Sequence, residues 1–224
     1  MAVGVTPSPR SRSRPALRHP TRPDELLAAA CRAIVQRGFG DTRVSDIAEE
    51  AGVSTGTIHY YFASKQEVLV EALRWASDRL FARLPRSEGA DAATRLAALL
   101  DLAIPYRRPK ARRDEYVLWI EMWTLVLHSR DRLPALEELS ARWRAFFFGV
   151  IGDGVAAGEF APVADAAMVA ERLIALVDGL GFETVIGYRW SSPERMRSLL
   201  VPFAAEQLSI DPQRLAALMK EVRR

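Results

Sequence analysis

Cysteine is almost missing from this sequence, because Cys31 is the single cysteine among 224 residues. One thiol cannot form an intrachain disulfide, which favours a reducing compartment. Long apolar runs are missing as well, since none approaches the roughly 18 residues that a membrane-spanning helix requires. The N-terminus shows no apolar segment typical of a secretory signal. We therefore expect a cytoplasmic protein that has no membrane partner.

Histidine is scarce and scattered, at His19, His59 and His128, so no spacing typical of a metal site is present. The sequence also shows no nucleophile elbow, no phosphate-binding glycine loop and no pair of carboxylates with a clear catalytic role. These absences disfavour an enzyme. We expect no catalytic residue, no metal ion and no cofactor.

Charge is nearly balanced, with 31 basic residues, 28 acidic residues and a formal net charge of +3. The positive excess lies in residues 1–22, which hold five arginines and no acid. Nucleic-acid binding must therefore be argued from a motif rather than from the isoelectric point. Residues 1–22 are also rich in proline and serine, which predicts a disordered tail. This tail is a basic arm for phosphates or the minor groove, an inert extension, or the result of a wrongly assigned start.

Helical spacing of apolar residues dominates everything after residue 22. Apolar residues form 49% of the chain and charged residues 26%, the balance of a globular protein with a sizeable core. No segment of useful length alternates as a strand does. We predict an all-α protein with a basic tail at 1–22, a helix-turn-helix head at 23–84 and a larger helical body at 85–224. The body is predicted to hold helices at about 91–104, 114–129, 133–157, 165–188, 193–208 and 212–222.

A helix-turn-helix motif at about residues 42–62 is the strongest signal in the chain. Two short helices share an apolar inner face, and Gly52 stands where the turn between them tolerates a positive φ. Thr42 can cap the first helix and Ser54 the second, whose free N–H groups then attract a phosphate. An ordinary pair of core helices is the alternative. The inner face consists of Ile47, Ala48, Ala51, Val53, Ile58 and Phe62.

Polar groups occupy the outer face of the second helix. Short or planar hydrogen-bonding side chains suit base edges and nearby phosphates. Gly56 permits a close approach to the duplex, and Lys65, at the start of the next helix, can reach a backbone phosphate. We predict DNA contacts by Ser54, Thr55, Gly56, Thr57, His59, Tyr60 and Lys65.

These residues resemble the tetracycline-repressor (TetR) family over about residues 23–82. The resemblance implies a three-helix DNA-binding head, joined by a fourth helix to a divergent ligand-binding and dimer-forming body. Thr55 and His59 stand where many members have lysine and tyrosine, so the operator sequence is not carried over. The matching residues are Thr42, Val44-Ser45-Asp46-Ile47-Ala48, Ala51-Gly52-Val53-Ser54, Gly56-Thr57-Ile58, Tyr60-Tyr61-Phe62 and Ser64-Lys65. The family's base and phosphate contacts would fall on Thr42, Thr55, Gly56, Thr57, His59, Tyr60 and Lys65.

Large aromatic side chains gather between residues 114 and 148, where they can line a ligand pocket. For each single residue, a packed core is the alternative. Glu121, Thr124 and His128 form a polar stripe, which either faces inward to neutralise a cationic ligand or faces solvent. We predict ligand contacts by Tyr116, Trp119, Glu121, Met122, Trp123, Leu127, Trp143 and Phe147.

The body resembles the TetR branch that includes the choline-responsive betaine repressors. The resemblance runs through residues 154–160 (Gly-Val-Ala-Ala-Gly-Glu-Phe) and 175–180 (Ala-Leu-Val-Asp-Gly-Leu), and it does not fix the ligand. In the family, two long helices of each subunit form a four-helix bundle, which implies a homodimer through about residues 166–208. Small residues there, Ala175, Gly179 and Gly181, would let helices approach closely. The apolar stripe expected at this interface is Val169, Leu173, Leu176 and Leu180, faced by Leu199, Leu200, Phe203 and Leu208.

The favoured function is a transcriptional regulator, usually a repressor in this family, that binds double-stranded operator DNA and responds to a small-molecule effector. We expect the effector to shift the long helix that starts at Lys65, which changes the separation of the two heads in a dimer. A helical interaction module or ligand receptor that no longer reads DNA is the alternative.

Overall fold

The computed structural model describes residues 23–84, 90–106 and 111–223, so the arginine-rich segment 1–22 lies outside the described residues. Within those ranges the chain is helical and contains no strand, as the all-α prediction requires. None of the helices described there is long and apolar enough to cross a membrane. The helices are α1 Pro23–Arg37, α2 Val44–Ala51, α3 Thr55–Tyr61, α4 Lys65–Phe81, α5 Ala92–Ala103, α6 Ala111–His128, α7 Leu133–Ala156, α8 Ala166–Ile186, α9 Pro193–Leu208 and α10 Pro212–Glu221.

Local capping explains where the head helices begin. The Ser54 hydroxyl accepts the N–H of Thr57 and so starts α3, as predicted. The prediction that Thr42 caps α2 is wrong, because α2 begins one residue later with Arg43 at the N-cap. The Arg43 N–H donates to the Asp46 carboxylate at 2.7 Å. Because Arg43 occupies the N-cap position and Asp46 accepts its N–H, no capping role is left for Thr42. Gly52 ends α2 in the left-handed conformation, at φ 69°.

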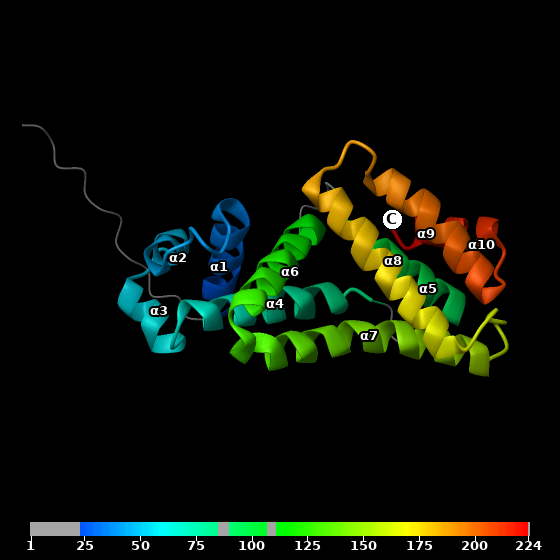
Figure 1. Cartoon of the computed structure of the whole chain (residues 1–224), viewed down its shortest axis with the longest axis horizontal. Helices are drawn as coiled ribbons and strands as arrows, with labels where there is room; N and C mark the ends of the chain where they lie inside the picture. The colour runs from blue at the N-terminus through cyan, green and yellow to red at the C-terminus, as the bar shows by residue number, and fades with distance from the viewer. Residues whose placement is uncertain (1–22, 85–89, 107–110, 224) are drawn as a thin grey trace, which may run out of the picture.

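The molecule is elongated, with α1, α2 and α3 at one end and α5, α8, α9 and α10 at the other (Figure 1). α4 leaves the small helices and runs toward the body, while α6 lies across it. α1, α2, α3 and the start of α4 enclose one apolar core, which includes Leu26, Ile47, Ile58 and Phe62. α5, α7, α8, α9 and α10 enclose a larger core.

A third core joins the two ends of the molecule. Ile34 of α1 and Leu69 of α4 pack there against Leu118 and Met122 of α6. All four side chains are at most 1% exposed. Burial of this kind contributes about 1.5–3 kcal/mol for each large aliphatic side chain. The three-helix head is therefore packed directly on the body through α6.

Half of the apolar stripe expected at a subunit interface is buried within the chain itself, and the other half, Leu176, Leu180, Leu199 and Phe203, is half-buried. Val169 and Leu173 of α8 are fully buried in the larger core of their own chain, as is Leu200 of α9. The face of α8 that remains open is rotated from that stripe by about one residue. It exposes the small residues Ala175 and Gly179.

Candidate nucleic-acid interface and ligand cavity

α3 presents its polar face to solvent. Tyr60 is 82% exposed, and Thr55, Gly56 and His59 are also exposed, although α3 itself is anchored by the fully buried Ile58. The rings of Tyr60 and Tyr61 meet edge to face at 5.1 Å between centroids. The Thr57 hydroxyl lies 3.0 Å from that of Ser54. These side chains stand outside the core on one rigid short helix, as a major-groove reader requires.

Two of the predicted contact residues are placed differently. Thr42 is 1% exposed, and its hydroxyl donates to the carbonyl of Gly38 at 2.6 Å, so its side chain faces the core rather than a phosphate. The Lys65 ammonium donates to the carbonyl of Gly40 at 3.0 Å and lies 4.4 Å above the Phe39 ring. An ammonium has three donors, so Lys65 retains N–H groups for a phosphate.

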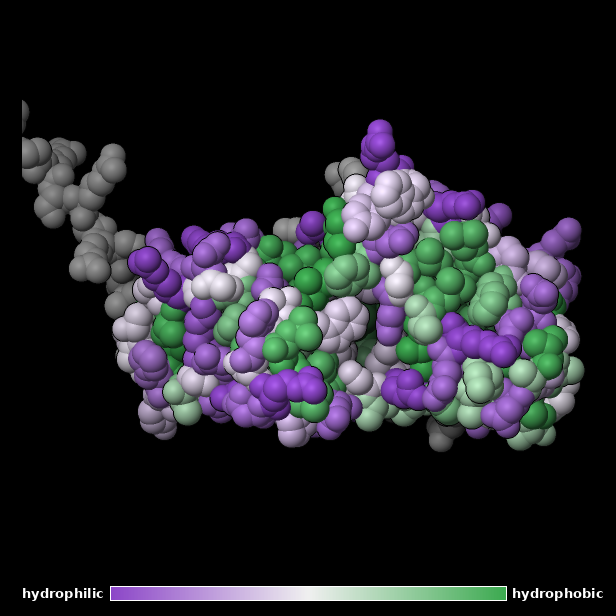
Figure 2. All heavy atoms as spheres, viewed as in Figure 1, coloured by the Kyte–Doolittle hydropathy of each residue, from purple (hydrophilic) through white to green (hydrophobic). Residues whose placement is uncertain are grey.

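A cavity of about 200 Å³ opens in the body between α4, α5, α6, α7 and α8. Figure 2 shows the surface hollowed between α6 and α8. One face of α6 forms a wall, because residues spaced by three and four positions point the same way. The lining residues are Leu80, Phe81, Leu102, Ala103, Arg112, Glu115, Tyr116, Trp119, Trp123, Ser140, Trp143, Arg144, Ile174 and Asp178.

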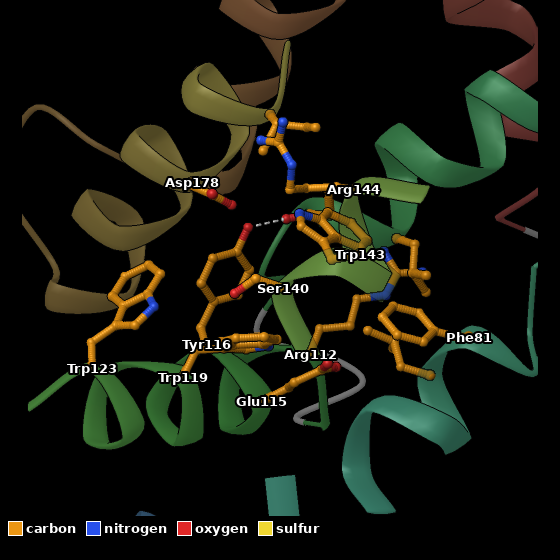
Figure 3. Close-up of a pocket in the computed structure, with 14 residues that line it drawn as sticks. Phe81, Arg112, Glu115, Tyr116, Trp119, Trp123, Ser140, Trp143, Arg144 and Asp178 are labelled. Carbon is orange, nitrogen blue, oxygen red and sulfur yellow. Dashed lines mark hydrogen bonds between the residues drawn. The ribbon is translucent and has the colours of Figure 1, made fainter. Parts of the chain in front are cut away.

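Four of the eight predicted ligand contacts line this cavity: Tyr116, Trp119, Trp123 and Trp143 (Figure 3). The other four lie elsewhere. Met122 and Phe147 are fully buried in the cores, and Leu127 is 74% exposed in the last turn of α6. Glu121 turns toward the head, where its carboxylate faces Gly38. Thr124 and His128 are exposed, so the polar stripe of α6 does not enter the cavity.

Two acidic residues of the cavity, Glu115 and Asp178, were not among the ligand contacts predicted from the sequence. Glu115 precedes Tyr116 and shares the helical face of Trp119, so the spacing already available on α6 could have found it. Asp178 lies on α8, which sequence analysis assigned to subunit contact. The signal was an acid inside the otherwise apolar stretch 173–182, a position that is costly unless the acid has a partner or a function.

Glu115 is the most buried charged group of the cavity wall, at 6% exposure. Its carboxylate accepts the hydroxyl of Ser77, a fully buried residue of α4, at 3.1 Å. Burial raises the pKa of Glu115 from 4.5 to about 7, although hydrogen bonds from Ser77 and Trp119 and the charge of Arg83 act in the opposite direction. A carboxyl of the cavity is thereby hydrogen-bonded to the helix that leads to the head.

Asp178 faces the cavity from α8 (Figure 3). Burial raises the pKa of Asp178 from 3.8 to about 6, against the effects of a hydrogen bond from Trp143 and of the charge of Arg144. Tyr116 lies between the two acids and donates its hydroxyl to the carbonyl of Ala103 at 2.8 Å. Burial raises the pKa of Tyr116 far above 10, with smaller contributions from Asp178 and Glu115, so it remains a neutral donor.

The two arginines of the lining are already paired. Arg112 lies 2.9 Å from the carboxylate of Asp101, which is itself 2% exposed. Arg144 lies 2.8 Å from the carboxylate of Glu171 on α8. Within the described ranges neither Glu115 nor Asp178 forms a salt bridge. When both acids are ionised, the lining therefore carries two negative charges that no salt bridge of the described residues neutralises.

The raised pKa of Glu115 predicts a pH dependence of stability. A carboxyl with a higher pKa in the folded chain stabilises the fold fully below its unfolded pKa, and this contribution is lost as the pH rises through the folded pKa. For Glu115 the window runs from 4.5 to about 7 and corresponds to roughly 3 kcal/mol. Glu115→Gln keeps an acceptor for Ser77 and removes the titration, so its unfolding free energy should gain on wild type as the pH rises.

Urea denaturation at several pH values measures this difference, with Glu137→Gln on the exposed face of α7 as the control for loss of one charge. If the unfolding free energies of wild type and Glu115→Gln ran parallel over this pH window, ionisation of the buried carboxyl would not destabilise the fold, contrary to the prediction.

Comparison with known proteins places both halves of the chain. A family model described as "Bacterial regulatory proteins, tetR family" matches residues 26–72, and one described as "BetI-type transcriptional repressor, C-terminal" matches residues 92–209. The transcriptional repressor KstR2 of Mycobacterium tuberculosis is 31% identical over 149 residues, which are 66% of this chain and 74% of KstR2. The regulator BetI of Agrobacterium fabrum is 30% identical over 165 residues, which are 72% of this chain and 75% of BetI.

A solved structure shows the same arrangement of helices. It is that of a transcriptional regulator from Saccharomonospora viridis in complex with choline, which is 34% identical to this chain with a TM-score of 0.71. The match covers 82% of this chain and 95% of the other. A TetR-family regulator from Rhodococcus is 30% identical with a TM-score of 0.73, over 83% of this chain and 97% of its own.

Proposed function

The chain belongs to the tetR family of bacterial regulatory proteins and has the BetI-type C-terminal domain, and from this premise we propose that its effector is an organic cation bound in the aromatic cavity. As a member of this family it is a DNA-binding transcriptional regulator and not an enzyme. We assign operator contact to α3, through Thr55, Gly56, Thr57, His59 and Tyr60, together with Ser54 at its N-cap and Lys65 at the start of α4. The domain division at about residue 85 and a cytoplasmic location belong to the same proposal.

The composition of the cavity wall carries the proposal for a cation. Trp119, Trp123 and Trp143 supply ring faces, and cations lie favourably over such faces when they are removed from water. Glu115 and Asp178 supply negative charge where the lining arginines are already paired. The structural neighbour from Saccharomonospora viridis holds choline, a quaternary ammonium of this chemical class.

The position of α6 provides a route from the cavity to DNA. Tyr116 and Trp119 face the cavity, whereas Leu118 and Met122 on the other side pack on α1 and α4. Glu115 also holds Ser77 of α4 through the buried hydrogen bond. A ligand that moves α6 therefore acts on both head helices at once, and only a ligand that favours one of two arrangements can shift the operator affinity.

A direct test measures operator binding with and without a cation. The test uses a duplex that the wild-type protein has enriched from a random pool, and the protein is titrated into it while fluorescence anisotropy is followed. The titration is repeated with choline, with tetramethylammonium, and with dimethylbutanol, the neutral carbon isostere of choline. We expect a cation to change the affinity by about 5- to 150-fold, the range of ordinary coupling between sites, and the neutral isostere to have no effect. An intact protein–DNA complex that ignores every cation tested, choline included, would refute the proposed effector class.

We also propose a homodimer through α8 and α9, because an operator reader of this type places two recognition helices about 34–36 Å apart. Apolar side chains gather over α8 and α9 in Figure 2. Met168 and Ile186 are 47% and 48% exposed near the two ends of α8, and Ala175 and Gly179 between them are exposed and small.

A bulky charge on that face tests the dimer. Gly179→Arg is expected to give a monomer in sedimentation velocity, because the guanidinium would be buried without a partner. Gly149→Arg, an exposed position of α7 with open space around it, is the matched control and should stay dimeric. A dimer that persists in Gly179→Arg at low protein concentration would place the interface elsewhere.

A further inference from the structure

We propose that the effector carries two cationic groups, one held by Glu115 and the other by Asp178, at opposite ends of the aromatic cavity. This inference rests on the proposed function and narrows its effector class from a cation to a dication. It follows from the arrangement of charges in the wall.

The two carboxylates belong to separate binding ends. Glu115 projects from α6 and accepts a hydrogen bond from the indole of Trp119, whereas Asp178 projects from α8 and accepts one from the indole of Trp143. Figure 3 shows the two acids apart from each other, with Tyr116 and Ser140 between them. Each end thus combines an acid with a tryptophan, the pairing that a desolvated cation requires.

The arginines near the cavity do not neutralise both acids. Arg112 of the lining is held by Asp101, and Arg144 is held by Glu171. Arg83 attracts Glu115 and Arg144 attracts Asp178, but these attractions are smaller than the effect of burial on either acid. Burial therefore disfavours the ionised form of both carboxyls, and positive charge that enters the cavity would stabilise it.

A ligand with one charge can satisfy only one end. The second carboxyl must then stay protonated or remain an uncompensated charge beside an apolar part of the ligand, and both outcomes cost binding free energy. A dication removes that cost at both ends. Because the bound form requires both acids ionised, the advantage of the second charge should increase as the pH rises through the pKa values of about 6 and about 7.

The experiment uses a ligand series that differs only in charge. Bis(trimethylammonium) alkanes with spacers from ethylene to hexamethylene are compared, on the full-length protein by calorimetry, with isosteres in which one trimethylammonium is replaced by tert-butyl. We expect at least one spacer for which the dication binds about tenfold or more tightly than its isostere near pH 8, and an advantage that shrinks near pH 6. Near pH 6, where both acids of the free protein are partly protonated, the dication should also release more protons than its isostere, a difference seen by repeating the titration in buffers of different ionisation enthalpy.

Single variants assign the two ends. In Glu115→Gln and in Asp178→Asn, the dication should bind only about as tightly as its isostere. Glu137→Gln, on the exposed face of α7, should keep the wild-type preference for the dication. The wild-type series alone already decides the matter if a variant fails to fold. Isosteres that bind as tightly as dications at every spacer, while choline still shifts operator affinity, would refute the dication and leave the proposed function standing. Absence of binding by every cation would refute both.

Discussion

Replacing Thr57 and Tyr60 together by alanine is expected to lower operator affinity by about 100-fold or more and to leave the fold intact. A well-placed polar side chain contributes about 1–3 kcal/mol of discrimination at a base edge, and two such losses combine to this range. Tyr60 is 82% exposed, so its truncation removes little packing. The Thr57 N–H that caps α3 on Ser54 remains in the variant. The unfolding free energy should change by no more than about 0.5 kcal/mol for such surface positions.

Fluorescence anisotropy with the enriched duplex measures the loss, and thermal denaturation confirms the fold. Leu127→Ala is the matched control, because Leu127 is 74% exposed but lies on α6 in the body. The control should bind DNA as wild type does. If the double variant binds the duplex with wild-type affinity, α3 does not read DNA, and the alternative of a module without DNA recognition becomes the better account.

Gly181→Ala is expected to lower the unfolding free energy by about 1–3 kcal/mol, the usual cost of overpacking a core. A Cβ atom on Gly181 would lie 2.3 Å from the Tyr116 hydroxyl oxygen and 2.4 Å from two ring carbons. Tyr116 must then move, and its hydrogen bond to the Ala103 carbonyl is lost or weakened. Since Tyr116 lines the cavity, the variant should also lose most of its response to cations.

Gly152→Ala provides the comparison, because a Cβ at this position of α7 meets no atom within 4 Å. It should hold or raise stability by about 0.5–1 kcal/mol, since alanine favours a helix more than glycine does. Urea denaturation of the pair separates helix propensity from crowding. Equal stability of Gly181→Ala and wild type would contradict the prediction and show that α8 or Tyr116 moves at little cost to accept the methyl group.

Gly181 also shows why the head was easier to predict than the body. The head depends on local signals, namely caps, a turn glycine and short-range periodicity, and these lie within about twenty residues of one another. The sequence identified Gly181 as small, but its partner Tyr116 lies on another helix, so its role was assigned to subunit contact. Thr42 illustrates the limit within the head, because the N-cap lies one residue later at Arg43 and the Thr42 side chain is buried.

The cavity depends on the rotation of α6 about its axis. Trp119 and Met122 are both large and apolar, and periodicity alone cannot tell which side meets a ligand when a helix is apolar nearly all round. The structure resolves this by placing Met122 against α1 and α4, which leaves Trp119 and Trp123 for the cavity. Asp178 could not be assigned because its neighbours come from α6 and α7, which are distant in sequence.

The two-sided packing of α6 also has an engineering consequence. Positions 116, 119 and 123 line the cavity, whereas positions 118, 122 and 126 join the head to the body. A library randomised at the first set would change what the protein senses while the residues that relay occupancy to DNA stay in place. Trp119 alone touches both sets, because it also packs on the joining core, so it is the position to hold constant when a sensor for a new compound is selected.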